Sequence, residues 1–186
     1  MKNQPTNEKL ARDNSVIKTI LERRSCRSFR SDPLPEEHIE LLTETLRWAP
    51  SAGNRQPWRF YIVTSEKKRR ELAEAAYGQN FIIPAPVHFA IIAVPEESLS
   101  RYGDRGARLF CIQDTAAAVE NLMLAATALG YGSCWIGAFD ELAAAKALAL
   151  PSGHRPVAII PVGRPARHGP RTDRRPAAET VTRVEE

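Results

Sequence analysis

The chain has 186 residues, a length typical of one domain with a sizeable core, and 43% of them are hydrophobic and 26% charged. No apolar run reaches the roughly 18–20 residues of a membrane helix, and residues 1–7 lack the apolar segment of a signal peptide, so we expect a cytoplasmic protein outside the membrane. The cysteines Cys26, Cys111 and Cys134 are odd in number and widely spaced, which argues against a disulfide framework or a zinc site.

The formal net charge of +4 comes mainly from arginine, concentrated near Arg23 and again from Arg164 to Arg175. A nucleic-acid footprint is typically a basic stripe with interleaved aromatic residues, and we expect no nucleic-acid partner because that pattern is missing. Two distant arginine clusters suit a small phosphorylated ligand gripped from two sides, since guanidinium donors match phosphate oxygens in pairs. A weakly basic surface without a ligand is the alternative.

The polar residues 1–12 are expected to form a mobile tail. A helix should follow over residues 14–23, because its apolar residues recur on one face: Val16, Ile17, Ile20 and Leu21. It ends in a basic run that places three guanidinium groups and a hydroxyl within five residues: Arg23, Arg24, Ser25, Cys26 and Arg27. This run suits a phosphate, but it also suits the negative end of a helix dipole without any ligand.

A second helix is predicted over residues 35–48, with Pro35 at its start. Residues 49–58 are rich in Pro, Gly, Ser and Asn and therefore form a loop. Its side chains Ser51, Asn54 and Gln56 can each donate and accept hydrogen bonds, which suits a polar heterocycle. A capped turn between helix and strand is the alternative.

Runs of apolar and β-branched residues predict three core strands, at residues 59–64, 87–94 and 156–163. His88 lies inside the second strand, where a structural role is favoured over a catalytic one. The longest helix should span residues 105–129, and it is apolar nearly all round, so we expect it to be buried in a core or against another subunit.

A short strand within residues 131–137 runs into a glycine turn, and a last helix is predicted over residues 141–148. From Arg164 onward the chain is rich in Arg and Pro and has no apolar face until Val181. This end of the chain either stays mobile or lies on another surface, such as a second copy of the chain.

Four stretches of the sequence resemble the nitroreductase family of flavoproteins. They occur in the family's order: RRSCRSF at 23–29, APSAGNRQPW at 49–58, GYGSCWIG at 130–137 and VGRPARHGPRTDRRP at 162–176. Residues 114–121 also resemble the family's central helix, and the resemblance covers nearly all of residues 17–181. Each stretch alone is moderately specific, and the signal lies in the four together.

The resemblance implies an α+β fold, a three-layer α/β/α sandwich with a mixed, mostly antiparallel central sheet and a long buried central helix. It also implies an intertwined homodimer with two FMN sites at the subunit interface. Residues 13–163 would form the FMN-binding domain. Residues 164–186 would form a C-terminal extension that packs on the flavin site or on the partner subunit.

The resemblance also assigns cofactor-binding residues. Arg23 and Ser25, with Arg24 alongside, would bind the FMN phosphate and ribityl chain. Arg174 would close on the phosphate from the other side, although Arg171 and Arg175 compete for that role. The remaining positions would contact the ring system. Arg27 would lie at the N1–C2=O edge, and Trp135, Ile136 and Gly137 would line the ring, with the Gly137 N–H pointing toward N5. The partner subunit would contribute Pro50, Ser51, Ala52 and Asn54.

The activity implied is an FMN-dependent oxidoreductase that takes hydride from NADH or NADPH and passes electrons to a nitroaromatic, quinone or related conjugated acceptor in a ping-pong cycle. A fixed cation near N1 would favour the reduced flavin, and no catalytic side chain is expected because flavin N5 carries the chemistry. The alternatives are a flavin-binding module or redox sensor with little turnover, and a relative that performs reductive dehalogenation or flavin fragmentation.

Cys26 lies within the basic run, where neighbouring positive charge would favour the thiolate and a redox role. We favour the competing interpretation, in which Cys26 is a small residue that fills space beside the ligand.

Overall fold

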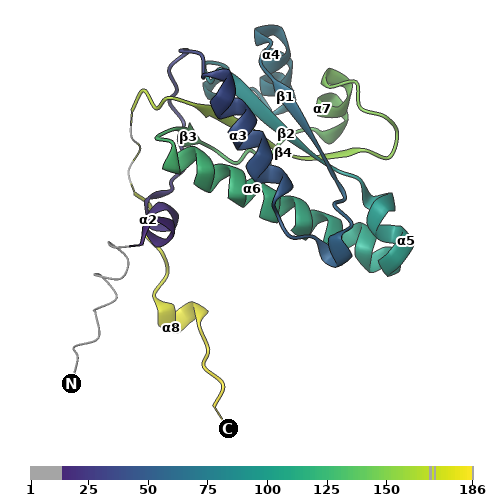
Figure 1. The fold of residues 1–186 in the computed structure, drawn as a ribbon. Helices are drawn as coiled ribbons and strands as arrows, with labels where there is room; N and C mark the ends of the chain where they lie inside the picture. The colour runs from purple at the N-terminus through teal and green to yellow at the C-terminus, as the bar shows by residue number, and fades with distance from the viewer. Residues whose placement is uncertain (1–13, 168, 170, 186) are drawn as a thin grey trace, which may run out of the picture.

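The computed structural model describes residues 14–167, 169 and 171–185; the predicted mobile tail, residues 1–12, lies outside them. Its centre is one four-stranded sheet in the order β1-β2-β4-β3 (Figure 1). The strands are β1 (Trp58–Val63), β2 (Val87–Ala93), β3 (Gly132–Ser133) and β4 (Arg155–Gly163). All of these strand pairs are antiparallel, which confirms the mostly antiparallel sheet, and the parallel contact that joins Ser25 to Ser133 is an isolated bridge.

Helices cover both faces of this sheet and confirm the three-layer prediction. Because side chains alternate along a strand, Phe89 and Ile91 of β2 and Ile160 of β4 enter one core, whereas Ile159 enters the other. The first core is completed by α3 (Glu36–Arg47) and α6 (Cys111–Ala128). The second is completed by α4 (Glu66–Ala75), the 3-10 turn Asn80–Ile82 and α7 (Glu141–Ala147).

The central helix begins later than the predicted residue 105. A separate helix, α5 (Pro95–Arg105), comes first, and a π-helical turn over Gly106–Phe110 joins it to α6. By length and composition the whole stretch Pro95–Ala128 could cross a membrane. In this fold, however, Leu122 and its neighbours on one face of α6 are fully buried against the sheet and α3, as expected of a core helix.

Two further helices, α2 (Ser15–Glu22) and α8 (Ala177–Thr180), have no buried residues. In α2, the Asn14 side chain accepts hydrogen bonds from the backbone N–H groups of the first turn. α2 contacts α6 near one end of that helix, whereas α5 lies at the opposite end (Figure 1). The C-terminal α8 and residues 181–185 lie away from the body of the fold (Figure 1).

Candidate functional site

The two arginine clusters meet at one edge of the sheet. The basic run is tied to β3 because the Cys26 N–H donates to the Ser133 carbonyl oxygen at 2.8 Å. Just beyond it, Arg30 N–H donates to Arg164 O at 2.9 Å and Ala166 N–H to Ser28 O at 2.8 Å. These antiparallel contacts place the chain after β4 alongside residues 28–30.

A cavity of about 400 Å³ opens beside this junction, within the range of small-molecule sites. The charged and hydroxyl-bearing residues of the two clusters that line it are three arginines and a serine, with one acidic residue beside them: Arg24, Arg167, Arg171, Ser25 and Glu22. A second hollow of about 340 Å³ shares Arg24, Ser25 and Arg167 and adds Arg27 and Thr172. We refer to the two together as the basic cavity. Its donors are those that bind phosphate oxygens.

Arg23 lies beside the basic cavity but is turned toward α6. Its Nε is 3.6 Å from Glu120 Oε1, and its side chain is 20% exposed. Among the three competing C-terminal arginines, Arg171 lines the cavity and donates to the Leu21 carbonyl oxygen. Arg174 instead donates to the Thr172 and Asp173 backbone within its own segment. Arg167 was not among the predicted residues, because the path of the chain after β4 has no local sequence signal.

The predicted ring-lining stretch follows β3 directly. Trp135 is 40% exposed, and Gly137 is also exposed. Ile136 is 3% exposed and packs in the second core, and its backbone exchanges two 3.0 Å hydrogen bonds with Ile159. Trp135 and the Gly137 backbone are therefore accessible, whereas the Ile136 side chain serves the core.

The polar loop after α3 has an unusual backbone. Its 3-10 turn spans Ala52–Asn54, and Gly53, Asn54 and Gln56 have φ values of 55°, 54° and 51°. Left-handed non-glycine residues carry conformational strain and cluster at functional sites. Local bonds hold the loop: Gln56 N–H donates to Ser51 Oγ at 3.0 Å, and Gln56 Nε2 donates to Asn54 Oδ1 at 3.2 Å.

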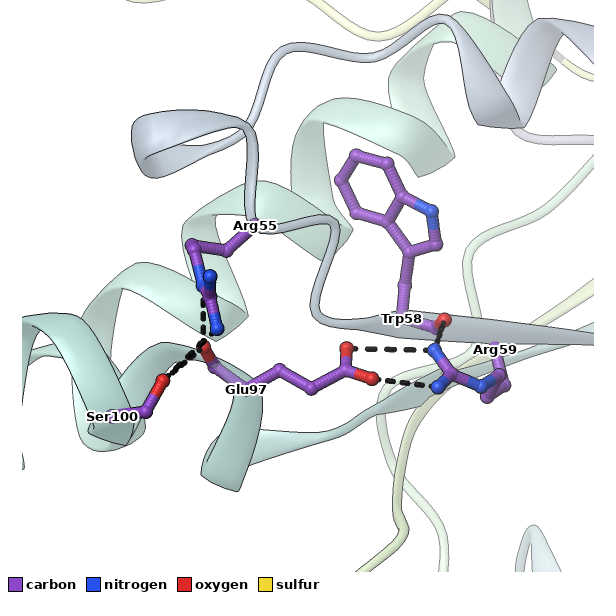
Figure 2. A network of polar contacts seen from close by, with 5 residues as sticks. All are labelled: Arg55, Trp58, Arg59, Glu97 and Ser100. Atoms are coloured by element: carbon purple, nitrogen blue, oxygen red, sulfur yellow. Dashed lines mark hydrogen bonds and ion pairs between the residues drawn. The ribbon is translucent and has the colours of Figure 1, made fainter.

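Two helices anchor this loop from outside. On α6, Asp114 accepts the Ala52 N–H at 3.1 Å through Oδ1; the carboxylate is 7% exposed, and burial raises its pKa. On α5, the Glu97 backbone oxygen and the Ser100 hydroxyl accept from Arg55 at 2.9 and 3.0 Å. Figure 2 shows this network, which continues from the Glu97 carboxylate to Arg59 at 2.6 Å. Pro50 and Asn54 remain exposed.

Within one chain, the loop and the basic cavity lie near opposite ends of α6. Asp114 anchors the loop, while Thr127 lines the cavity. Thirteen helical residues at 1.5 Å each separate the two positions by about 20 Å. A side chain cannot span that distance, so the structure does not bring Pro50, Ser51, Ala52 and Asn54 to the cavity of their own chain.

Cys26 differs from the thiolate expectation. Its side chain is 6% exposed, and its Sγ–H donates to the Ser28 carbonyl oxygen at 3.2 Å. Burial raises the pKa of the thiol more than Arg24 lowers it, since desolvation penalises the charged form. The neighbouring charge therefore does not favour the thiolate, and the structure agrees with the favoured interpretation that Cys26 is a small space-filling residue, here buried and lining the cavity.

The geometry described above is that of an α+β protein with an arginine-rich cavity at one edge of its sheet. The sequence pattern described as "Nitroreductase family" matches residues 20–92 and 78–164. The chain belongs to the nitroreductase family.

Individual relatives agree with this assignment. A Thermus thermophilus protein named NADH dehydrogenase is 32% identical over 188 residues, covering 87% of this chain and 92% of its own. A Bacillus subtilis protein named FMN reductase (NADPH) is 29% identical, covering 82% and 67%. The solved structure of Bacillus megaterium NfrA2 superposes with a TM-score of 0.85 at 26% identity, covering 93% and 75%.

Proposed function

We propose that the protein is an FMN-dependent oxidoreductase that takes hydride from NADH or NADPH and delivers electrons to a nitroaromatic, quinone or related conjugated acceptor in a ping-pong cycle. The observation that carries the proposal is the basic cavity, where guanidinium groups from both ends of the chain converge on one hollow. This donor set fits the phosphate of FMN. Names of relatives support the same cofactor and reductant.

Ser25, Arg24, Arg167 and Arg171 would hold the phosphate and the ribityl chain. Arg23 can join them, because its contact with Glu120 is long at 3.6 Å and the Glu120 side chain is half-exposed, so a phosphate can replace that carboxylate. Arg174 lies outside both hollows, in the segment leading to α8, and would have to turn away from the Thr172 and Asp173 backbone to take the same role.

When bound, FMN supplies the hydride-accepting ring, and the protein supplies binding, orientation and charge. Arg27 lines the second hollow and would stabilise negative charge on the ring system. The exposed Trp135 and the Gly137 backbone would flank the ring and could offer an N–H donor to it. No side chain needs to act as a nucleophile or as a general acid.

The proposal includes a homodimer. A second chain related by a two-fold axis would bring the loop of one protomer, with Pro50, Ser51, Ala52 and Asn54, to the basic cavity of the other. An eight-residue helix is not stable alone, yet α2 exposes Val16, Ile17, Ile20 and Leu21 by 40–63%. Between α2 and the Leu124 side of α6 lies an apolar hollow of about 270 Å³. These surfaces suit burial against a second copy.

The test starts with the visible spectrum of the purified protein, followed by anaerobic addition of NADH or NADPH. We expect bound FMN that bleaches on addition of the reductant. Arg23→Ala should weaken FMN binding about tenfold or more, as expected for a charge-assisted hydrogen bond, whereas Arg70→Ala, a surface arginine on α4 paired with Glu66, should not.

The outcomes separate the alternatives. If no flavin is bound and added FMN neither binds nor bleaches, the proposal is wrong. Bound FMN with negligible NAD(P)H oxidation, whatever the acceptor, would instead identify a flavin-binding module or redox sensor.

A further inference from the structure

A cationic and aromatic cluster occupies the end of α5 and the π-helical turn that follows it. The Arg101 guanidinium carbon lies 5.6 Å from the Tyr102 ring centroid, and that of Arg105 lies 5.5 Å from the Phe110 centroid. The two rings meet edge to face with centroids 5.2 Å apart. We call these four residues the α5 patch.

The charges of the patch are open to a ligand. Both arginines are exposed, and both rings are partly exposed. Within the described ranges, neither guanidinium forms an ion pair with a carboxylate, whereas the nearby Arg108 lies 3.9 Å from Asp104. A guanidinium held on an aromatic face keeps its outward N–H donors, so the patch offers an aromatic edge and unneutralised positive charge together.

The patch lies against the loop that the proposed function places at the flavin. A Cβ at Gly53 would collide with the Tyr102 hydroxyl, and Arg101 Nε lies 3.2 Å from where that Cβ would be. The network of Figure 2 fixes this contact, because Arg55 binds Glu97 and Ser100 one turn earlier on α5. The patch and the loop are therefore in direct contact, and hydrogen bonds hold them together.

The backbone around the patch departs from α-helical geometry on both sides. Gly103 has φ 57° and ψ −153°, a conformation essentially restricted to glycine. The turn over Gly106–Phe110 is π-helical, a feature frequent at functional sites. These two departures set the directions in which Tyr102 and Phe110 project, and a regular helix would not bring their rings together.

We propose that the α5 patch recognises the electron acceptor and selects planar aromatic acceptors that carry a negative charge, such as nitrobenzoates. The acceptor's ring would pack on the Tyr102–Phe110 pair, and its anionic group would bind Arg101 and Arg105. This inference rests on the proposed function, because only that function places a conjugated acceptor next to residues 50–54.

The experiment compares kcat/KM for 4-nitrobenzoate with that for its neutral counterpart 4-nitrobenzamide, at saturating NADH. The wild-type protein should prefer the anion, and the preference should shrink as ionic strength rises. Arg101→Gln should lower the ratio of the two values about two- to fivefold, the effect of losing one exposed ion pair. The matched control Arg108→Gln, an equal charge change nearby, should leave the ratio unchanged.

Two results would overturn the inference. One is an unchanged ratio in the double variant Arg101→Gln/Arg105→Gln with FMN still bound and bleached by NADH, which leaves the proposed function intact. The other is that Arg101→Gln leaves the ratio of the two kcat/KM values unchanged but slows the anaerobic bleaching of the flavin by NADPH and not by NADH. That result would assign the patch to the extra phosphate of NADPH. Absence of bound flavin would instead contradict the proposed function itself.

Discussion

His88 illustrates how burial sets the charge of a single residue. It is fully buried in β2, its Nε2 lies 2.8 Å from the Ile82 carbonyl oxygen, and Nδ1 has no partner within the described residues. Burial lowers its pKa from 6.5 to about 4, because desolvation disfavours the imidazolium. The histidine is therefore neutral at physiological pH and structural, consistent with the role favoured from the sequence.

This residue should make the fold sensitive to acid. The unfolded chain binds a proton at His88 more readily than the folded chain does. The contribution of neutral His88 to the free energy of unfolding is therefore fully present above pH 6.5 and is lost as the pH falls toward 4. Between pH 7 and pH 5 this residue alone should cost about 2 kcal/mol of the free energy of unfolding. Urea unfolding of the wild type and of His88→Gln at both pH values measures it. An equal loss in both proteins would contradict the assignment.

At the scale of elements, α6 supports the strained loop through one hydrogen bond from a buried carboxylate. Asp114→Ala would leave the Ala52 N–H without its acceptor, at a cost of about 1–3 kcal/mol, and the left-handed residues of the loop would lose their anchor. We expect lower stability and weaker FMN binding, measured by urea unfolding and flavin titration.

Asp114→Asn is the matched control for this prediction. It keeps an oxygen that can accept from Ala52 and removes a charge that burial penalises. It should therefore retain most of the stability and flavin affinity. If Asn were as damaging as Ala, the negative charge and not the hydrogen bond would be the feature that matters.

The sequence predicts those elements whose pattern is local. β2 and β4 are recognisable because continuous apolar runs mark buried strands, and α3 begins directly after Pro35. In contrast, α5 was missed, since it is polar and contains Gly103, although Pro95 followed by two glutamates is a helix-start signal. The late start of α6 results from a π-helical turn, which has no sequence signature.

The candidate site divides in the same way. Residue type marks the basic run and the polar loop as candidates, because arginine beside a hydroxyl suits a phosphate and Ser, Asn and Gln suit a polar heterocycle, but each stretch alone also fits a purely structural role. The ion pair of Arg23 with Glu120 and the presence of Arg167 in the cavity depend on packing between distant segments. Such contacts come from the tertiary fold, and local patterns do not encode them.

At the scale of the whole molecule, the separation of loop and cavity leads to a mixing experiment. Arg23→Ala should impair the basic half of both sites in a dimer, and Asn54→Val should impair the loop half, because a β-branched residue disfavours left-handed φ. A mixed dimer would contain one doubly impaired site and one intact site. Random reassembly of equal amounts should therefore restore about a quarter of wild-type activity, since half of the dimers are mixed.

Activity is measured after co-expression or refolding of the two variants together. Each variant refolded alone provides the control and should remain impaired. If mixing restored nothing while mixed dimers were demonstrably formed, both halves of the site would have to come from one protomer.

The length of α6 has a further consequence. Asp114, which anchors the loop, and Thr127, which lines the cavity, both lie on this helix. Adding or removing a single residue between them would therefore rotate one end of the helix relative to the other by about 100° and shift it by about 1.5 Å. Tolerance of insertions and deletions should therefore be lowest in the middle of this helix. In a two-fold dimer, its dimensions would also fix the spacing between the two catalytic centres.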